Sequence, residues 1–160
     1  MDIAIEIALK DLSSARLSGA DITCEVAGGK RLHLFGEVFY HRVGDKVRGL
    51  DASCKAYLKR LFSSQKVGAI IPHLEGQYLA VLTDPRGKTL QVFSDLHSRQ
   101  DYFYAQQDGM IYIGDSLEFI FRHIQPQYDQ RMLAHLFCVY GWYTPKGTTI
   151  YSNVRRLKAG

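Results

Sequence analysis

Two pairs of apolar segments, each pair joined by a tight-turn sequence, constrain the fold of this chain more than any other feature. Residues 77–83 and 88–95 are rich in β-branched and aromatic side chains, and they flank the sequence Asp-Pro-Arg-Gly, which has proline and glycine where a tight turn needs them. Residues 102–105 and 110–114 flank the turn sequence Gln-Asp-Gly in the same way. Four short strands in succession predict an antiparallel meander.

The first third of the chain is predicted to be β-structure as well. Residues 2–9 alternate loosely between apolar and polar side chains, as in a strand with one buried face. Residues 22–26 and 31–40 flank Ala-Gly-Gly-Lys, and two glycines between β-like segments favour a hairpin because both can adopt positive φ.

Helical periodicity appears only after this β-rich part. Residues 51–62 place four apolar side chains on one face, with Asp51 available as the N-cap. Gly68 and Pro72 interrupt the same spacing just afterwards and predict a shortened or kinked segment. Two further helices are predicted at 116–123 and 129–139, the latter capped by Asp129, and a last strand is predicted around Ile150. The residues alone therefore predict an α+β fold with antiparallel sheet.

Length and composition bound the class of protein. A chain of 160 residues with 46% hydrophobic residues is expected to form one domain, residues 1–160, around one core. The absence of a long apolar run or a secretory leader predicts no membrane span and a cytoplasmic location. Three cysteines without Cys-x-x-Cys spacing argue against a disulfide framework or zinc site, and a net charge of +4 from scattered basic residues argues against nucleic-acid binding.

Five sequence blocks in a fixed order connect the chain to a known family. They are Gly36-Glu37-Val38-Phe39-Tyr40, Leu74-Glu75-Gly76-Gln77-Tyr78-Leu79-Ala80, Ser94-Asp95 before Tyr102-Phe103-Tyr104, residues 109–116, and residues 136–160 with Gly141-Trp142-Tyr143-Thr144-Pro145. This order resembles the glutamine amidotransferase domain of asparagine synthetases, over residues 31–160. The resemblance implies a four-layer α/β/β/α sandwich of the N-terminal-nucleophile type, with residues 1–30 divergent or truncated.

The chain departs from the family at each catalytic position. Working enzymes of this class use an N-terminal cysteine, whereas residue 2 here is Asp2. The family's oxyanion-hole asparagine corresponds to Phe35, which cannot donate a hydrogen bond, so only the Gly36 N–H of that hole is expected to remain. The loop that carries the glutamine-binding arginine has no counterpart, and Asp51 is the one candidate for the amine ligand, with a helix cap as its plainer role.

The resemblance therefore implies a degenerate domain of the kind found in β-lactam synthetases and lasso-peptide cyclases. Its expected role is structural support of, or docking against, an asparagine-synthetase-type ATP-binding domain in cis or in trans. Tyr140, Trp142 and Tyr143 form the candidate docking surface, with core packing of these aromatics as the alternative. No cofactor is expected in this domain, since ATP and Mg belong to the C-terminal synthetase domain. A homodimer stays open.

Two other functions are open on sequence grounds. Glutamine hydrolysis could persist through another nucleophile, for which Cys24 is the candidate. A stand-alone module that binds a peptide or a protein is the third reading. The six histidines show no His-x-x-x-His spacing, so a metal site is not predicted. Successive residues of a strand point to opposite faces, so Asp95, His97 and Ser98 are not expected to form a relay. The segment 141–147 lacks the Gly-Lys-Ser/Thr ending of a phosphate loop.

Overall fold

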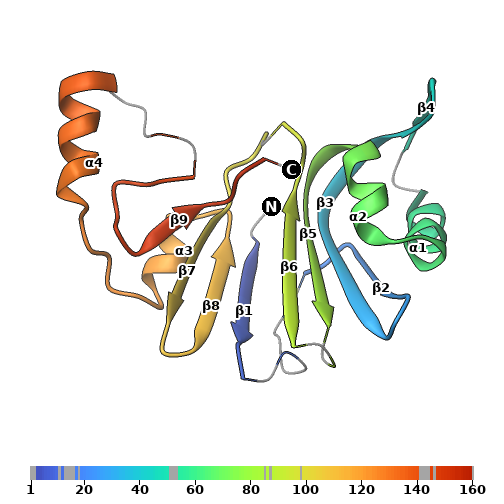
Figure 1. Cartoon of the computed structure of the whole chain (residues 1–160), viewed down its shortest axis with the longest axis horizontal. Helices are drawn as coiled ribbons and strands as arrows, with labels where there is room; N and C mark the ends of the chain where they lie inside the picture. The colour runs from blue at the N-terminus through green and yellow to red at the C-terminus, as the bar shows by residue number, and fades with distance from the viewer. Residues whose placement is uncertain are drawn as a thin grey trace.

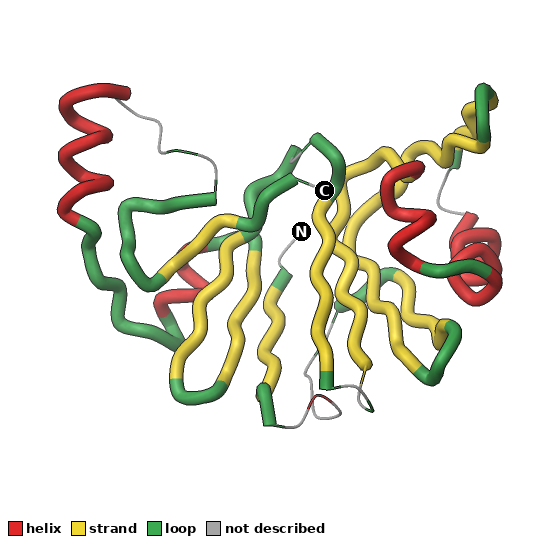
Figure 2. Tube along the Cα trace, viewed as in Figure 1, coloured by secondary structure: helices red, strands yellow, loops and turns green. Residues whose placement is uncertain are grey.

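The computed structural model of the chain contains two antiparallel sheets with helices at their flanks (Figure 1). It describes residues 3–10, 12, 17, 19–50, 54–84, 86, 88–97, 99–140, 145 and 147–159, without the side chains of residues 139 and 140. Strand is the dominant secondary structure (Figure 2). The predicted α+β class with antiparallel sheets is therefore confirmed.

The first sheet joins the two ends of the chain. Its strand order is β1-β8-β7-β9, with β1 at Ala4–Ala8, β8 at Met110–Gly114, β7 at Phe103–Gln107 and β9 at Val154–Arg156. The alternation predicted for the first strand is present, because Ile3, Ile5 and Ile7 are buried. The central strand β8 pairs with β1 on one side and β7 on the other.

The second sheet is built around one long strand pair. Its order is β2-β3-β5-β6, with β2 at Ile22–Val26, β3 at Lys30–Val43, β5 at Leu74–Asp84 and β6 at Thr89–Ser94. The predicted Gly-Gly hairpin joins β2 to β3, and both Gly28 and Gly29 have positive φ. A short strand, β4 at Lys46–Gly49, folds back on the end of β3 and was not predicted.

The predicted four-strand meander is wrong, although its four strands exist. Strands β5 and β6 form a hairpin in the second sheet, while β7 and β8 form a hairpin in the first. The chain changes sheets after Asp95, whose fully buried carboxylate accepts hydrogen bonds from the backbone N–H groups of His97 and Arg99. This turn carries β7 away from β6, so the two adjacent segments never pair.

Helices cover one face of each sheet. On the second sheet, α1 at Lys55–Ser64, α2 at Val67–Ile70 and a 3₁₀ turn at Ile71–His73 agree with the predicted helix and its interruption at Pro72. The N-cap position of α1 is Cys54, and Asp51 lies outside the described residues. The later helices are α3 at Leu117–Phe121, α4 at Gln130–His135 and a π-helical turn at Leu136–Tyr140.

Three apolar clusters hold these elements together. One lies between the second sheet and α1 and α2, and includes Leu34, Phe62 and Ile70. Another joins the two sheets and includes Ile5, Phe35, Leu79 and Ile113. The smallest lies between the first sheet and α3, with Ile120 and Val154 fully buried. Each sheet thus buries both of its faces.

The C-terminal region differs from the sequence prediction. Around Ile150 there is only an isolated bridge between Tyr128 and Tyr151, and the strand is β9, a few residues later. The Thr149 hydroxyl donates to the Val154 carbonyl, which turns the chain before β9. Among the described residues, no helix has both the length and the apolar character that crossing a membrane requires.

Candidate functional site

The strand β3 leaves an opening along one edge of the second sheet. Strand β2 pairs with β3 only as far as Leu34, and β4 begins to pair only at Tyr40, so residues 35–39 of β3 have neither strand beside them. A cavity of about 200 Å³ lies at this opening, between the sheet and the start of α1. Its walls are largely apolar, from Ile22, Leu34, Val38, Leu50 and Leu58.

The polar groups of this cavity come from Asp21, Gly36, Glu37 and Lys55. One carboxylate oxygen of Asp21 accepts a hydrogen bond of 2.8 Å from the Gly36 N–H, and the other is 3.5 Å from the Lys55 ammonium. Gly36 has a φ of 91°, a conformation that side chains disfavour, so glycine is required at this position of β3. The cavity is therefore a small apolar hollow with an ion pair at its rim.

Gly36 thus lies beside the start of α1. These are the two parts of the chain that the resemblance singled out for substrate binding. The Gly36 N–H, however, is occupied by a carboxylate. Asp51, the other predicted substrate-binding residue, lies outside the described residues. Asp2, which the resemblance places at the nucleophile position, lies outside them as well.

Phe35, which the resemblance places at the oxyanion-asparagine position, is on the opposite face of β3. Its side chain is 1% exposed and packs in the cluster between the sheets with Ile3 and Leu79. The Ile3 backbone N–H, near the beginning of the chain, donates to Asp115, which also accepts from Gln100. The surroundings of Phe35 and Ile3 are therefore apolar side chains and the hydrogen bonds of Asp115 with Ile3 and Gln100.

The cysteine proposed as a rescue nucleophile is poorly suited to attack. Cys24 lies on β2, half-buried against the cluster under α1. Burial raises the pKa of the Cys24 thiol, and the positive charge of Lys59 offsets this only in part. A higher thiol pKa means less thiolate at neutral pH, which lowers nucleophilicity.

The predicted docking surface falls at the edge of what the structure describes. Tyr140 ends the π-helical turn, its side chain is not described, and Trp142 and Tyr143 lie outside the described residues. The helix before them is unusual, because none of the residues of α4 is buried and Phe137 is 80% exposed. In Figure 1, α4 stands apart from both sheets.

Asp21 is the site residue that sequence reasoning missed. The Gly28-Gly29 turn fixes the register in which Ile22 pairs with Leu34, so the residue before Ile22, Asp21, falls opposite Phe35. The register therefore brings Asp21 to this part of β3, but the hydrogen bond from the Gly36 N–H to its carboxylate is seen only in the structure. Among the described residues, no group of three or more His, Cys, Asp or Glu side chains could hold a metal ion.

Comparison with known proteins adds no relative. No protein-family model matches the chain, and no curated protein matches it significantly.

Proposed function

We propose that this chain is a class II amidotransferase-like domain that does not hydrolyse glutamine and that docks against an asparagine-synthetase-type, ATP-dependent amide-forming domain. The resemblance of its sequence blocks motivates the proposal. Two of these blocks are direct neighbours, since Gly36 pairs with Tyr78. One apolar cluster lies between α1, α2 and the second sheet, one lies between the two sheets, and one lies between the first sheet and α3. This order of clusters fits a four-layer sandwich.

The observation that carries the loss of glutaminase activity is the hydrogen bond between Asp21 and the Gly36 N–H. Hydrolysis of an amide develops negative charge on the carbonyl oxygen, and an oxyanion hole must donate hydrogen bonds to it. Here one donor is replaced by the buried ring of Phe35, and the other is bonded to a carboxylate. A negative charge at this place repels the transition state, and losing a single donor typically costs about 10²–10³ in rate.

Helix α4 supports the docking role. Its apolar residues Met132 and Leu133 and the following Leu136 are only partly buried, and Phe137 is exposed. A helix with an apolar face gains most of its stability from packing that face, and α4 has little of this packing in the described chain. The proposed partner would cover α4 together with the aromatic segment at residues 140–143.

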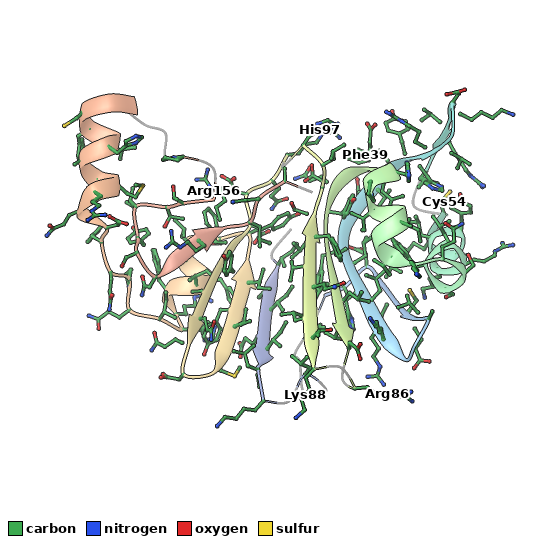
Figure 3. The ribbon with its side chains drawn as sticks, viewed as in Figure 1. Phe39, Cys54, Arg86, Lys88, His97 and Arg156 are labelled. Carbon is green, nitrogen blue, oxygen red and sulfur yellow. The ribbon has the colours of Figure 1, made fainter. Side chains whose placement is uncertain are left out.

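Glutamine hydrolysis is tested by ammonia release from glutamine with the purified chain and its Cys24→Ala variant. The proposal expects no ammonia above the rate without enzyme, in either protein. Ammonia production that disappears in Cys24→Ala would establish the glutaminase reading and refute the inactive one. Cys54→Ala is the matched control, because Cys54 is also partly exposed but lies at the start of α1 (Figure 3).

Docking is tested on the endogenous protein, by intact mass and by what co-purifies with it. The proposal expects either a product much larger than 18.2 kDa or an 18.2 kDa chain in complex with an ATP-dependent ligase. Replacing Leu133 and Phe137 by serine should then weaken the association at least about tenfold, since buried apolar side chains dominate interfaces. An 18.2 kDa product without such a partner would contradict the docking role.

A further inference from the structure

A second hollow, separate from the Gly36 cavity, lies between β4 and α1. It has a volume of about 330 Å³ and is lined by Arg48 from β4 and by Tyr57, Arg60, Leu61 and Ser64 from α1. We call it the arginine hollow. Its α1 residues differ from Lys55 and Leu58, which line the Gly36 cavity.

Arg48 is held in a defined position in this hollow. Its guanidinium carbon lies 4.1 Å from the centre of the Tyr57 ring. The Tyr57 hydroxyl is in turn hydrogen-bonded to Nδ1 of the buried His41, at 2.7 Å. Stacking on a fixed aromatic ring orients a guanidinium group before any ligand arrives and leaves its N–H donors free to bind.

Among the described residues, none of those that line the arginine hollow is acidic. Neither Arg48 nor Arg60 has an acidic partner in the same part of the chain. Three arginines elsewhere, Arg42, Arg122 and Arg156, each form an ion pair. Helix α1 itself contains no acidic residue. Arginines from two different elements thus line a hollow to which the described residues contribute no acidic side chain.

We propose that the arginine hollow binds the phosphate group of a small, soluble phosphate ester. A phosphate dianion has three terminal oxygens, enough for paired hydrogen bonds from both guanidinium groups, whereas one carboxylate has two. The volume fits a phosphate with a few further heavy atoms, at the lower end of small-molecule sites. The Tyr57 ring and Leu61 supply an apolar wall for the rest of the ester. This proposal does not depend on the proposed docking function.

The site is tested by following backbone amide shifts of the whole chain by NMR, during titration with inorganic phosphate and then with O-phosphoserine at constant ionic strength. We expect saturable shifts confined to β4 and α1 with either ligand. Arg48→Gln and Arg60→Gln should each weaken binding at least about tenfold, as expected for a charge-assisted pair. The matched control is Lys59→Gln, which removes one positive charge from the same helix outside the hollow.

Three results would overturn the proposal. One is the absence of saturable shifts with both ligands. Another is an equal loss of affinity in Lys59→Gln, which would indicate general attraction to a positive surface. The third is saturable binding that persists unchanged in both arginine variants. Far-UV circular dichroism of each variant verifies that the helices are retained. If Arg48→Lys binds phosphate more weakly than the wild type, the geometry of the guanidinium group and not its charge alone contributes to binding.

Discussion

Helices α1 and α4 have the same kind of amphipathic sequence and opposite surroundings. Helix α1 buries Leu58, Leu61 and Phe62 against the second sheet, whereas α4 buries none of its residues. Apolar spacing thus predicts where a helix forms, but it does not reveal whether its partner lies in the same chain. The difference separates a half of the molecule whose helix packs on its own sheet from a half whose helix has an apolar face that the described residues bury only in part.

The sharpest test replaces phenylalanine by alanine in the two helical regions. Phe62→Ala removes a fully buried ring and should reduce the free energy of unfolding by about 3–5 kcal/mol. Phe137→Ala removes a ring that is 80% exposed and should change it by less than about 0.5 kcal/mol. Urea unfolding of both variants measures the two values. Equal losses would mean that α4 packs against the rest of the chain in solution.

Helix caps give a smaller version of the same comparison. The Ser116 hydroxyl caps α3 and the Asp129 carboxylate caps α4, each accepting hydrogen bonds from backbone N–H groups two or three residues later. Substituting either by alanine should cost about 1 kcal/mol. In Ser116→Ala the loss should appear in global unfolding, because α3 buries Ile120.

In Asp129→Ala the loss should instead fray α4 alone. Amide hydrogen exchange at residues 133–136 would quicken, while the global unfolding midpoint would stay unchanged. A fall of the midpoint as large as that of Ser116→Ala would show that α4 is coupled to the core.

The covered half should also respond to pH through His41. Burial, together with the positive charges of His73 and Arg48, lowers the pKa of His41 in the folded protein. The unfolded chain then binds more protons as pH falls below about 6.5, so this contribution to stability is present above that pH and is lost below it. His41→Gln should flatten the decline in unfolding free energy between pH 7.5 and 5.5. An unchanged slope would assign the decline to other groups.

The labelling rates of two cysteines compare the two regions without a measurement of stability. Cys138, in the π-helical turn after α4, is exposed, whereas Cys24 is half-buried with a raised pKa. Cys138 should react at least about tenfold faster with a disulfide reagent, since labelling requires access and thiolate. Cys138→Ser should abolish the fast phase, and a bound partner should slow it. A fast phase that remains in this variant would refute the assignment.

Local chemistry predicted most of the elements. The Gly28-Gly29 turn, the Pro72 interruption and the Asp129 cap each act within a few residues, and the hairpin, the short helix and α4 are where those residues predict them. The division of strands between two sheets was not predicted, because it depends on how the buried Asp95 redirects the chain. Strand β4 was not predicted because all its residues are exposed, so it has no buried face that a sequence pattern could indicate.

The candidate site residues also divide into those that local sequence identifies and those that only the tertiary structure brings together. Gly36 was singled out by its sequence block, and the inability of Phe35 to donate a side-chain hydrogen bond follows from the residue type alone. The contact of Asp21 with Gly36 required the hairpin register. The arginine hollow could not be predicted at all, since Arg48 and Arg60 come together only when β4 folds beside α1. The basic residues are scattered along the sequence, and no motif distinguishes Arg48 and Arg60 from the others.

The pairing of β1 with β8 has a consequence for how the protein is made. The hydrogen bond from Ile3 to Asp115 spans 112 residues of sequence, and β9 completes the same sheet still later. The second sheet, by contrast, ends at Ser94 and can assemble while the ribosome is still translating the remainder. The isoleucine-rich first strand then has no strand partner until the β7–β8 hairpin emerges, so during synthesis it is an unpaired apolar segment of the kind that favours aggregation.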